Sequence, residues 1–72
     1  MRPIADIGVA PQRHDAIEYQ GKVYEVLDIE DGKVIYRVRP AVPKRARWMT
    51  LHGWKTLCQS RGAEESEYTS GT

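Results

Sequence analysis

A strand–turn–strand pattern between residues 22 and 39 constrains the fold of this chain more than any other feature. Two runs rich in β-branched and aromatic residues, KVYEVLDIE and KVIYRVR, flank the dipeptide Asp31-Gly32. Such residues fit a pleated, half-buried surface. Asp-Gly is a strong signal for a hairpin turn, because glycine adopts the positive φ that such turns require. We therefore predict an antiparallel β-hairpin over Lys22 to Arg39.

The second run of the hairpin alternates strictly, whereas the first does not. Positions 34, 36 and 38 are apolar and share one face of a strand, and positions 33, 37 and 39 carry cations on the other. The first run changes phase near Val26-Leu27. That change indicates either a central strand covered on both faces or a β-bulge at this point.

A shorter pattern before the hairpin adds one strand. Residues Ala16 to Tyr19 alternate, and Gln20-Gly21 follows them where a two-residue turn joins antiparallel strands. A helix that ends at Gly21 as its C-terminal cap is the alternative. The strand is favoured, because Ile17 would be the only large aliphatic anchor of that helix.

The segment from Pro40 to Cys58 contains a loop and then an ambiguous pattern. Two prolines interrupt the sheet ladder and favour an extended, positively charged loop. We then predict a strand around Arg45 to Thr50, followed by a helical turn or a further strand through Leu57. In the helical alternative Thr50 is the N-cap, and apolar residues recur on one face after it.

The two ends of the chain differ from its middle, so we predict a single domain over residues 14–60. Residues 1–13 contain two prolines and a glycine, which disfavour a helix and indicate an N-terminal arm, either poorly ordered or extended along a sheet edge. Residues 61–72 are polar, acidic and almost free of aliphatic side chains. They are predicted to form a mobile acidic tail.

The predicted fold is mainly β, with four or five antiparallel strands in a curled sheet or an SH3-like barrel and a short helical turn near the C-terminus in one alternative. The barrel is an analogy of architecture and carries no function. A domain of 72 residues buries only about 60% of its unfolded surface. A homodimer that adds buried surface is therefore an open alternative.

Charge is polarised along the chain, although its formal net charge is only +1. No Asp or Glu occurs between residues 33 and 63. Cations gathered on one side of the sheet would form a stripe able to neutralise phosphates, beside an exposed indole able to stack on a base. The residues predicted to bind nucleic acid or an acidic protein are Arg37, Arg39, Lys44, Arg45, Arg47, Trp48 and Lys55.

Two plainer interpretations compete with that binding surface. Arg37 or Arg39 can pair with a carboxylate across the hairpin, such as Glu25 or Asp28. In a domain with few large apolar residues, tryptophans more often lie in the core than on a ligand platform. The sequence does not decide whether the two tryptophans face inward or outward.

Catalytic and metal-binding patterns are weak. Cys58 is the only cysteine, and beside a leucine it indicates a small buried hydrophobe better than a nucleophile activated by His52. His14, His52 and Cys58 lack the paired spacing of zinc ligands. We therefore expect no enzymatic activity, no metal and no cofactor.

The sequence thus predicts a small non-enzymatic binding module that contacts nucleic acid through a basic face and loop. The alternative is a protein-interaction module or small inhibitor that docks on an acidic protein. One cysteine allows no internal disulfide, and no window is long and apolar enough for a membrane span or a secretory signal. We expect a cytoplasmic protein without membrane contact.

Overall fold

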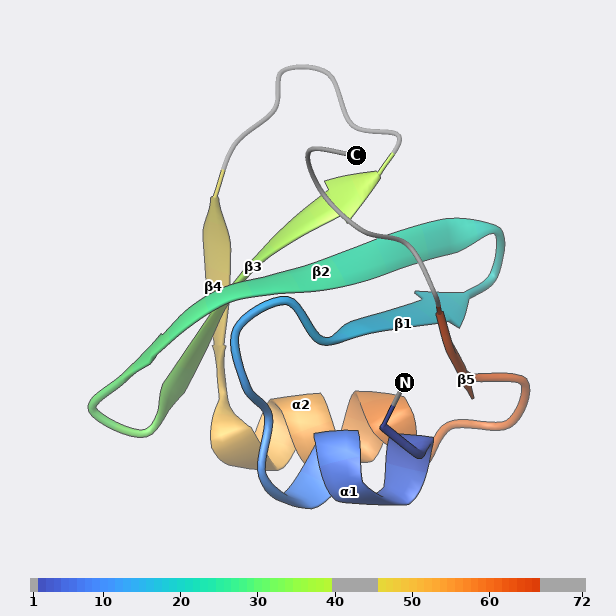
Figure 1. Cartoon of the computed structure of the whole chain (residues 1–72), viewed down its shortest axis with the longest axis horizontal. Coiled ribbons are helices and arrows are strands. Elements are labelled where there is room, and N and C mark those ends of the chain that lie inside the picture. The colour runs from blue at the N-terminus through green and yellow to red at the C-terminus, as the bar shows by residue number, and fades with distance from the viewer. Residues whose placement is uncertain (1, 40–45, 67–72) are drawn as a thin grey trace.

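The computed structural model describes residues 2–39 and 46–66. Within them, five antiparallel strands form one sheet in the order β4-β3-β2-β1-β5, and two short helices cover one of its faces (Figure 1). The elements are α1 (Ile4–Val9), β1 (Ala16–Tyr19), β2 (Lys22–Glu30), β3 (Lys33–Arg39), β4 (Arg47–Thr50), α2 (Leu51–Cys58) and β5 (Glu64–Glu65). The mainly β fold is confirmed, and the described strands form an open sheet and do not close into a barrel.

Both predicted two-residue turns are present. Asp31 and Gly32 have φ values of 48° and 74°, and Gln20 and Gly21 have φ values of 53° and 77°. Positive φ at both central residues is typical of type I′ turns, whose twist matches that of the flanking strands. The strands therefore leave each turn already in register, from the pairs Glu30↔Lys33 and Tyr19↔Lys22.

The change of phase in β2 is a β-bulge, as one of the two interpretations predicted. The register between β2 and β3 shifts between Val26 and Asp28. Before the shift Tyr24 and Val26 contact the core, and after it Ile29 does so. The extra residue thus keeps apolar side chains on the helix side along the whole strand.

The core lies between the sheet and the two helices. Trp54 of α2 is fully buried, and its Nε1–H donates a hydrogen bond to the carbonyl of Ile7, 3.0 Å away. The ring of Tyr36 lies with its centroid 6.3 Å from that of Trp54, in a tilted arrangement favourable for aromatic pairs. The buried cluster consists of Ile7, Ile17, Val26, Val34, Tyr36, Trp54 and Cys58.

The N-terminal segment is helical, which corrects the predicted extended or poorly ordered arm. Pro3 caps α1, a position where a proline is tolerated because the first N–H groups of a helix have no helical partner. Gly8 lies where a Cβ atom would come within 3.0 Å of the Cβ of Cys58, so it allows α1 to approach α2 closely. The residues that disfavoured a helix in the sequence instead start it and pack it.

Residues 51–58 form a helix, which was one of the two alternatives predicted from the sequence, and not a further strand. Thr50 caps α2, and its Oγ1 accepts a hydrogen bond from the N–H of Gly53 at 3.0 Å. Trp54 and Cys58 are the buried residues of this helix. Because the two are four residues apart, the helix places both on the face that packs on the core. No helix in the described ranges is long and apolar enough to cross a membrane.

The predicted acidic tail begins as part of the sheet. Glu64 and Glu65 form β5 and pair with β1 through Glu18↔Glu64 and Ile17↔Glu65. The carboxylate of Glu65 accepts a hydrogen bond from the backbone N–H of Ile4 at 2.9 Å. Both ends of the described chain, outside the predicted 14–60 range, therefore contact the sheet; residues 67–72 lie outside the described part.

The burial of α1 gives a direct test of its place in the core. We expect Ile7→Ala to lower the free energy of unfolding by about 2–4 kcal/mol, because a side chain that is 1% exposed is truncated. Val9→Ala is the control in the same helix, because Val9 is 70% exposed, and it should change stability by less than about 0.5 kcal/mol. Urea unfolding followed by tryptophan fluorescence measures both. Equal effects of the two substitutions would contradict the packing of α1.

Candidate functional site

The sheet has one face covered by the helices and an opposite face, called the outer face below. Cross-strand pairing determines which side chains meet there. Glu25 lies opposite Arg37, and Ile35 lies opposite both Asp28 and Trp48. Because strand residues alternate between faces, the cations of β3 and the carboxylates of β2 share the outer face.

Arg37 and Arg39 converge on one buried carboxylate. The Oε1 atom of Glu25 lies 3.2 Å from Nη2 of Arg37 and 3.4 Å from Nε of Arg39. Glu25 is only 1% exposed, and each arginine side chain is 24% exposed. Opposite charges at this distance offset the cost of removing the carboxylate from water. The pairing across the hairpin, one of the alternatives from sequence, is confirmed.

Trp48 also projects to the outer face, from the neighbouring strand β4, but its environment differs from that of the two arginines. Its side chain is 60% exposed, whereas Trp54 is 0% exposed. The Nζ atom of Lys33 lies 4.7 Å from the centroid of the Trp48 ring, a cation–π contact worth about 0.5–1 kcal/mol at an exposed site. Ile35, the cross-strand partner of Trp48, is half-buried beside it. The large exposed aromatic is thus held in place by two residues of β3.

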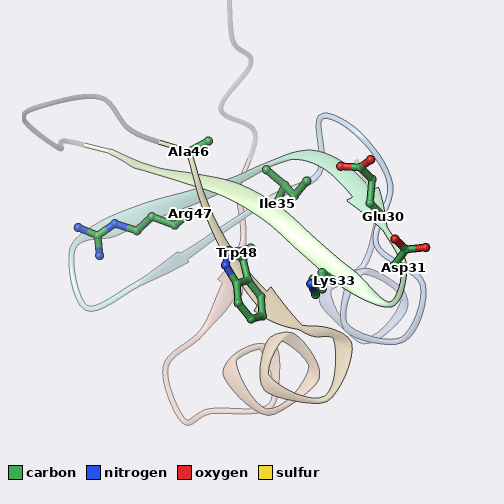
Figure 2. A pocket seen from close by; sticks show the side chains of 7 residues that line it. All are labelled: Glu30, Asp31, Lys33, Ile35, Ala46, Arg47 and Trp48. Atoms are coloured by element: carbon green, nitrogen blue, oxygen red, sulfur yellow. The ribbon is translucent and has the colours of Figure 1, made fainter.

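A hollow of about 310 Å³ opens beside this indole, over β3 and the turn that joins β2 to β3. Figure 2 shows Trp48, Lys33 and Ile35 in its middle and the carboxylates of Glu30 and Asp31 at one end. We call these five residues, with Ala46 and Arg47 at the other end, the Trp48 surface. Its lining is Glu30, Asp31, Lys33, Ile35, Ala46, Arg47 and Trp48.

Of the remaining cations of the predicted binding set, Arg47 and Lys55 lie in the described part of the chain. Arg47 is exposed and pairs with Tyr36, so its side chain leaves β4 on the helix side, and in Figure 2 its guanidinium points away from Lys33. Lys55 is exposed on α2. Lys44 and Arg45 lie outside the residues that the structure describes. The described members are therefore divided between the two sides of the sheet, and their roles in binding stay predictions.

Carboxylates further limit the positive charge of the outer face. The pairs Glu18↔Val23 and Val23↔Arg39 place Glu18 on that face, beside Glu64 of the edge strand. These two carboxylates, and those of Glu25, Asp28 and Glu30 in β2, lie on the same face of the sheet as the cations of β3. The outer face described here carries mixed charge and is not a continuous basic stripe.

Lys33 and Ile35 beside Trp48, and Glu25 between the two arginines, were absent from the predicted binding set. The alternation of β3 already placed Lys33 and Ile35 on the face of Arg37. Their proximity to Trp48 depends on the register between β3 and β4. Those strands are separated in the sequence by residues 40–46, and no turn signal there determines that register.

Cys58 is a buried thiol, as its apolar context predicted. Burial raises its pKa from 9.0 to about 11, and the negative charge of Asp15 adds to the increase. The thiolate, which is the nucleophilic and metal-binding form, is therefore disfavoured at neutral pH. The described residues contain no group of three or more His, Cys, Asp or Glu that is placed to hold a metal ion.

Comparisons with known proteins place this chain in no family. No protein-family model, no curated protein and no solved structure matches it.

The shared carboxylate predicts a measurable cost of removal. We expect Glu25→Gln to lower the free energy of unfolding by about 2–4 kcal/mol, because two largely buried guanidinium groups lose a common counter-charge. Glu30→Gln, an exposed glutamate on the same strand, is the matched control and should cost less than about 0.5 kcal/mol. Urea denaturation of both variants distinguishes them. A Glu25 variant as stable as the control would contradict this role.

The raised pKa of Cys58 predicts a pH-dependent stability. The folded state holds the thiol proton to about pH 11, whereas the unfolded chain releases it near pH 9. Stability is therefore expected to fall between pH 9 and pH 11, by up to about 3 kcal/mol from this group. In Cys58→Ala this contribution is absent, and the difference between the two proteins isolates it from tyrosine and lysine titration. Urea unfolding under reducing conditions measures the difference, and parallel pH curves would contradict it.

Proposed function

We propose that this chain is a small non-enzymatic protein-interaction module that docks an acidic partner protein on the Trp48 surface. The observation that carries the proposal is the exposed indole of Trp48, 60% accessible on a strand at the sheet edge. Tryptophan is among the residues most enriched at the energetic centres of protein interfaces. Ile35 adds apolar area beside it, and the ladder with β3 holds both side chains in place before any partner arrives.

Mixed charge on the outer face supports a protein partner over a polyanion. The carboxylate of Glu25 already takes up charge from Arg37 and Arg39, and further carboxylates share that face. Around β4 and α2 the balance is different, since the sequence from residue 46 to residue 63 has no Asp or Glu. Arg47 and Lys55 are exposed there. These cations favour the approach of an acidic protein to that edge.

Nucleic acid is the second candidate, favoured by one specific observation. Lys33, Arg37 and Arg39 alternate along the outer face of β3, and the exposed indole of Trp48 stands on the next strand. A cationic row beside an aromatic is the arrangement on which single-stranded nucleic acid binds, with backbone contacts and base stacking. It ranks second because Arg37 and Arg39, two of the three cations in that row, already share the carboxylate of Glu25 and have less charge to offer to phosphates.

The two tryptophans provide the test of this proposal, since Trp54 serves as an internal control. We expect an acidic protein, captured by the chain after nuclease treatment, to shift the indole N–H resonance of Trp48 and to leave that of Trp54 unchanged. Trp48→Ala should weaken the complex about 30-fold, in the range of interface hot spots. Circular dichroism of this variant checks that the fold is retained.

Two outcomes would overturn the assignment. Capture that is equally strong with Trp48→Ala would remove the surface from the interaction. A Trp48 shift produced by single-stranded oligonucleotides, with affinity that falls steeply between 50 mM and 200 mM salt, would replace the protein partner by nucleic acid.

A further inference from the structure

We infer that the partner binds as an extended acidic segment that adds to the sheet as a new strand along β4. This inference rests on the proposed function and specifies the form of the partner and its position. Three features support it: the outward backbone groups of β4, the side chains that alternate along β4, and the difference in charge between the β4 edge and the β5 edge of the sheet.

The backbone of β4 offers hydrogen bonds on its outer side. Within the described ranges β4 pairs with β3 alone and forms one edge of the sheet (Figure 1). The N–H of Leu51 donates to the carbonyl of Gly32 at 3.0 Å, which identifies the residues whose backbone faces β3. By the alternation of an antiparallel ladder, Met49 and Arg47 also face β3, and Trp48 faces outward. An added strand can therefore accept from the N–H of Trp48 and donate to its carbonyl.

The side chains of β4 indicate the residue pattern of the added strand. Trp48 projects to the outer face, and Arg47 projects to the helix side. Residues opposite each other in paired strands share a face and contact one another. The residue opposite Trp48 should therefore be aromatic or β-branched, and the neighbour that faces Arg47 should be acidic. The expected segment alternates acidic and apolar side chains.

The charge of the two sheet edges selects β4 for an acidic strand. At the opposite edge, β5 consists of Glu64 and Glu65, and Glu64 lies directly opposite Glu18. An acidic segment there would meet like charges, which are destabilising in cross-strand positions. At β4 it meets Arg47, with the cation Lys55 on the following helix. The charge of the β4 edge therefore matches an acidic peptide, and the charge of the β5 edge does not.

A displayed library of seven-residue segments tests this inference on the full chain. Selection should enrich segments that alternate Glu or Asp with aromatic or β-branched residues, and it should deplete proline, which lacks the N–H that a ladder needs. A synthetic peptide of the selected sequence should shift the backbone amides of β4 and leave those of β5 unchanged. Its N-methylated version, blocked at alternate amides, should bind at least about tenfold more weakly.

A pair of charge-reversal variants measures the electrostatic contribution to the affinity for the peptide. Arg47→Glu should weaken the selected peptide about tenfold and improve binding of its lysine-substituted counterpart. Lys22→Glu is the control, because Lys22 is an exposed cation at the turn between β1 and β2. It should change the affinity by less than twofold.

The outcomes separate the inference from the function on which it rests. A folded acidic partner that requires Trp48 but leaves the β4 amides unshifted would overturn strand addition and retain the docking surface. Equal enrichment of the same segments on the wild type and on Trp48→Ala would overturn both the strand addition and the docking surface. Selection of basic segments would do the same. Concentration-dependent shifts of the β4 amides without any peptide would identify a second copy of the chain as the occupant and would overturn the acidic segment.

Discussion

The register between β2 and β3 is the constraint on which the rest of the structure depends. β2 also pairs with β1, and β3 also pairs with β4, so this one ladder positions four of the five strands. The turn at Asp31-Gly32 starts the ladder, and the bulge after Val26 corrects its phase. A slip of one residue would exchange the two faces, expose Val34 and Tyr36, and bury the cations between them.

The same register explains why similar cations have different environments. Arg37 lies opposite Glu25, and Arg39 is within reach of the same carboxylate, so both are part of the folded structure's own electrostatics. Arg47 lies opposite Tyr36 at the edge and is exposed. Cations that already balance a buried carboxylate have less to offer a ligand than cations at an exposed edge. The proposed interface therefore moves from the middle of β3 to β4.

The two tryptophans differ in burial: Trp54 lies in the core, and Trp48, the centre of the proposed interface, is exposed. A domain this small needs large buried side chains, and Trp54 supplies one at the point where α1, α2 and the sheet meet. Trp48 adds nothing comparable to the core, since most of its surface is in contact with solvent. An exposed indole beside a strand edge that pairs with no other described strand is costly for solubility, and the proposed binding at that edge would account for its presence.

Local sequence signals determined the central hairpin and both tight turns, because each depends on residues that are neighbours along the chain. For the bulge in β2 and the capped helix from Leu51 they left two interpretations open, and the structure decided between them. They also indicated that Cys58 is buried, and they allowed, as one interpretation, a cross-hairpin ion pair at Arg37 or Arg39. Only the tertiary structure decided the rest. The helix of α1 forms because Ile7 and Gly8 find partners in α2, which no local rule encodes. The choice of Trp54 for the core and Trp48 for the surface depends on how β4 pairs with β3. These strands are not joined by a tight turn, and pairing between them leaves no signature in neighbouring residues.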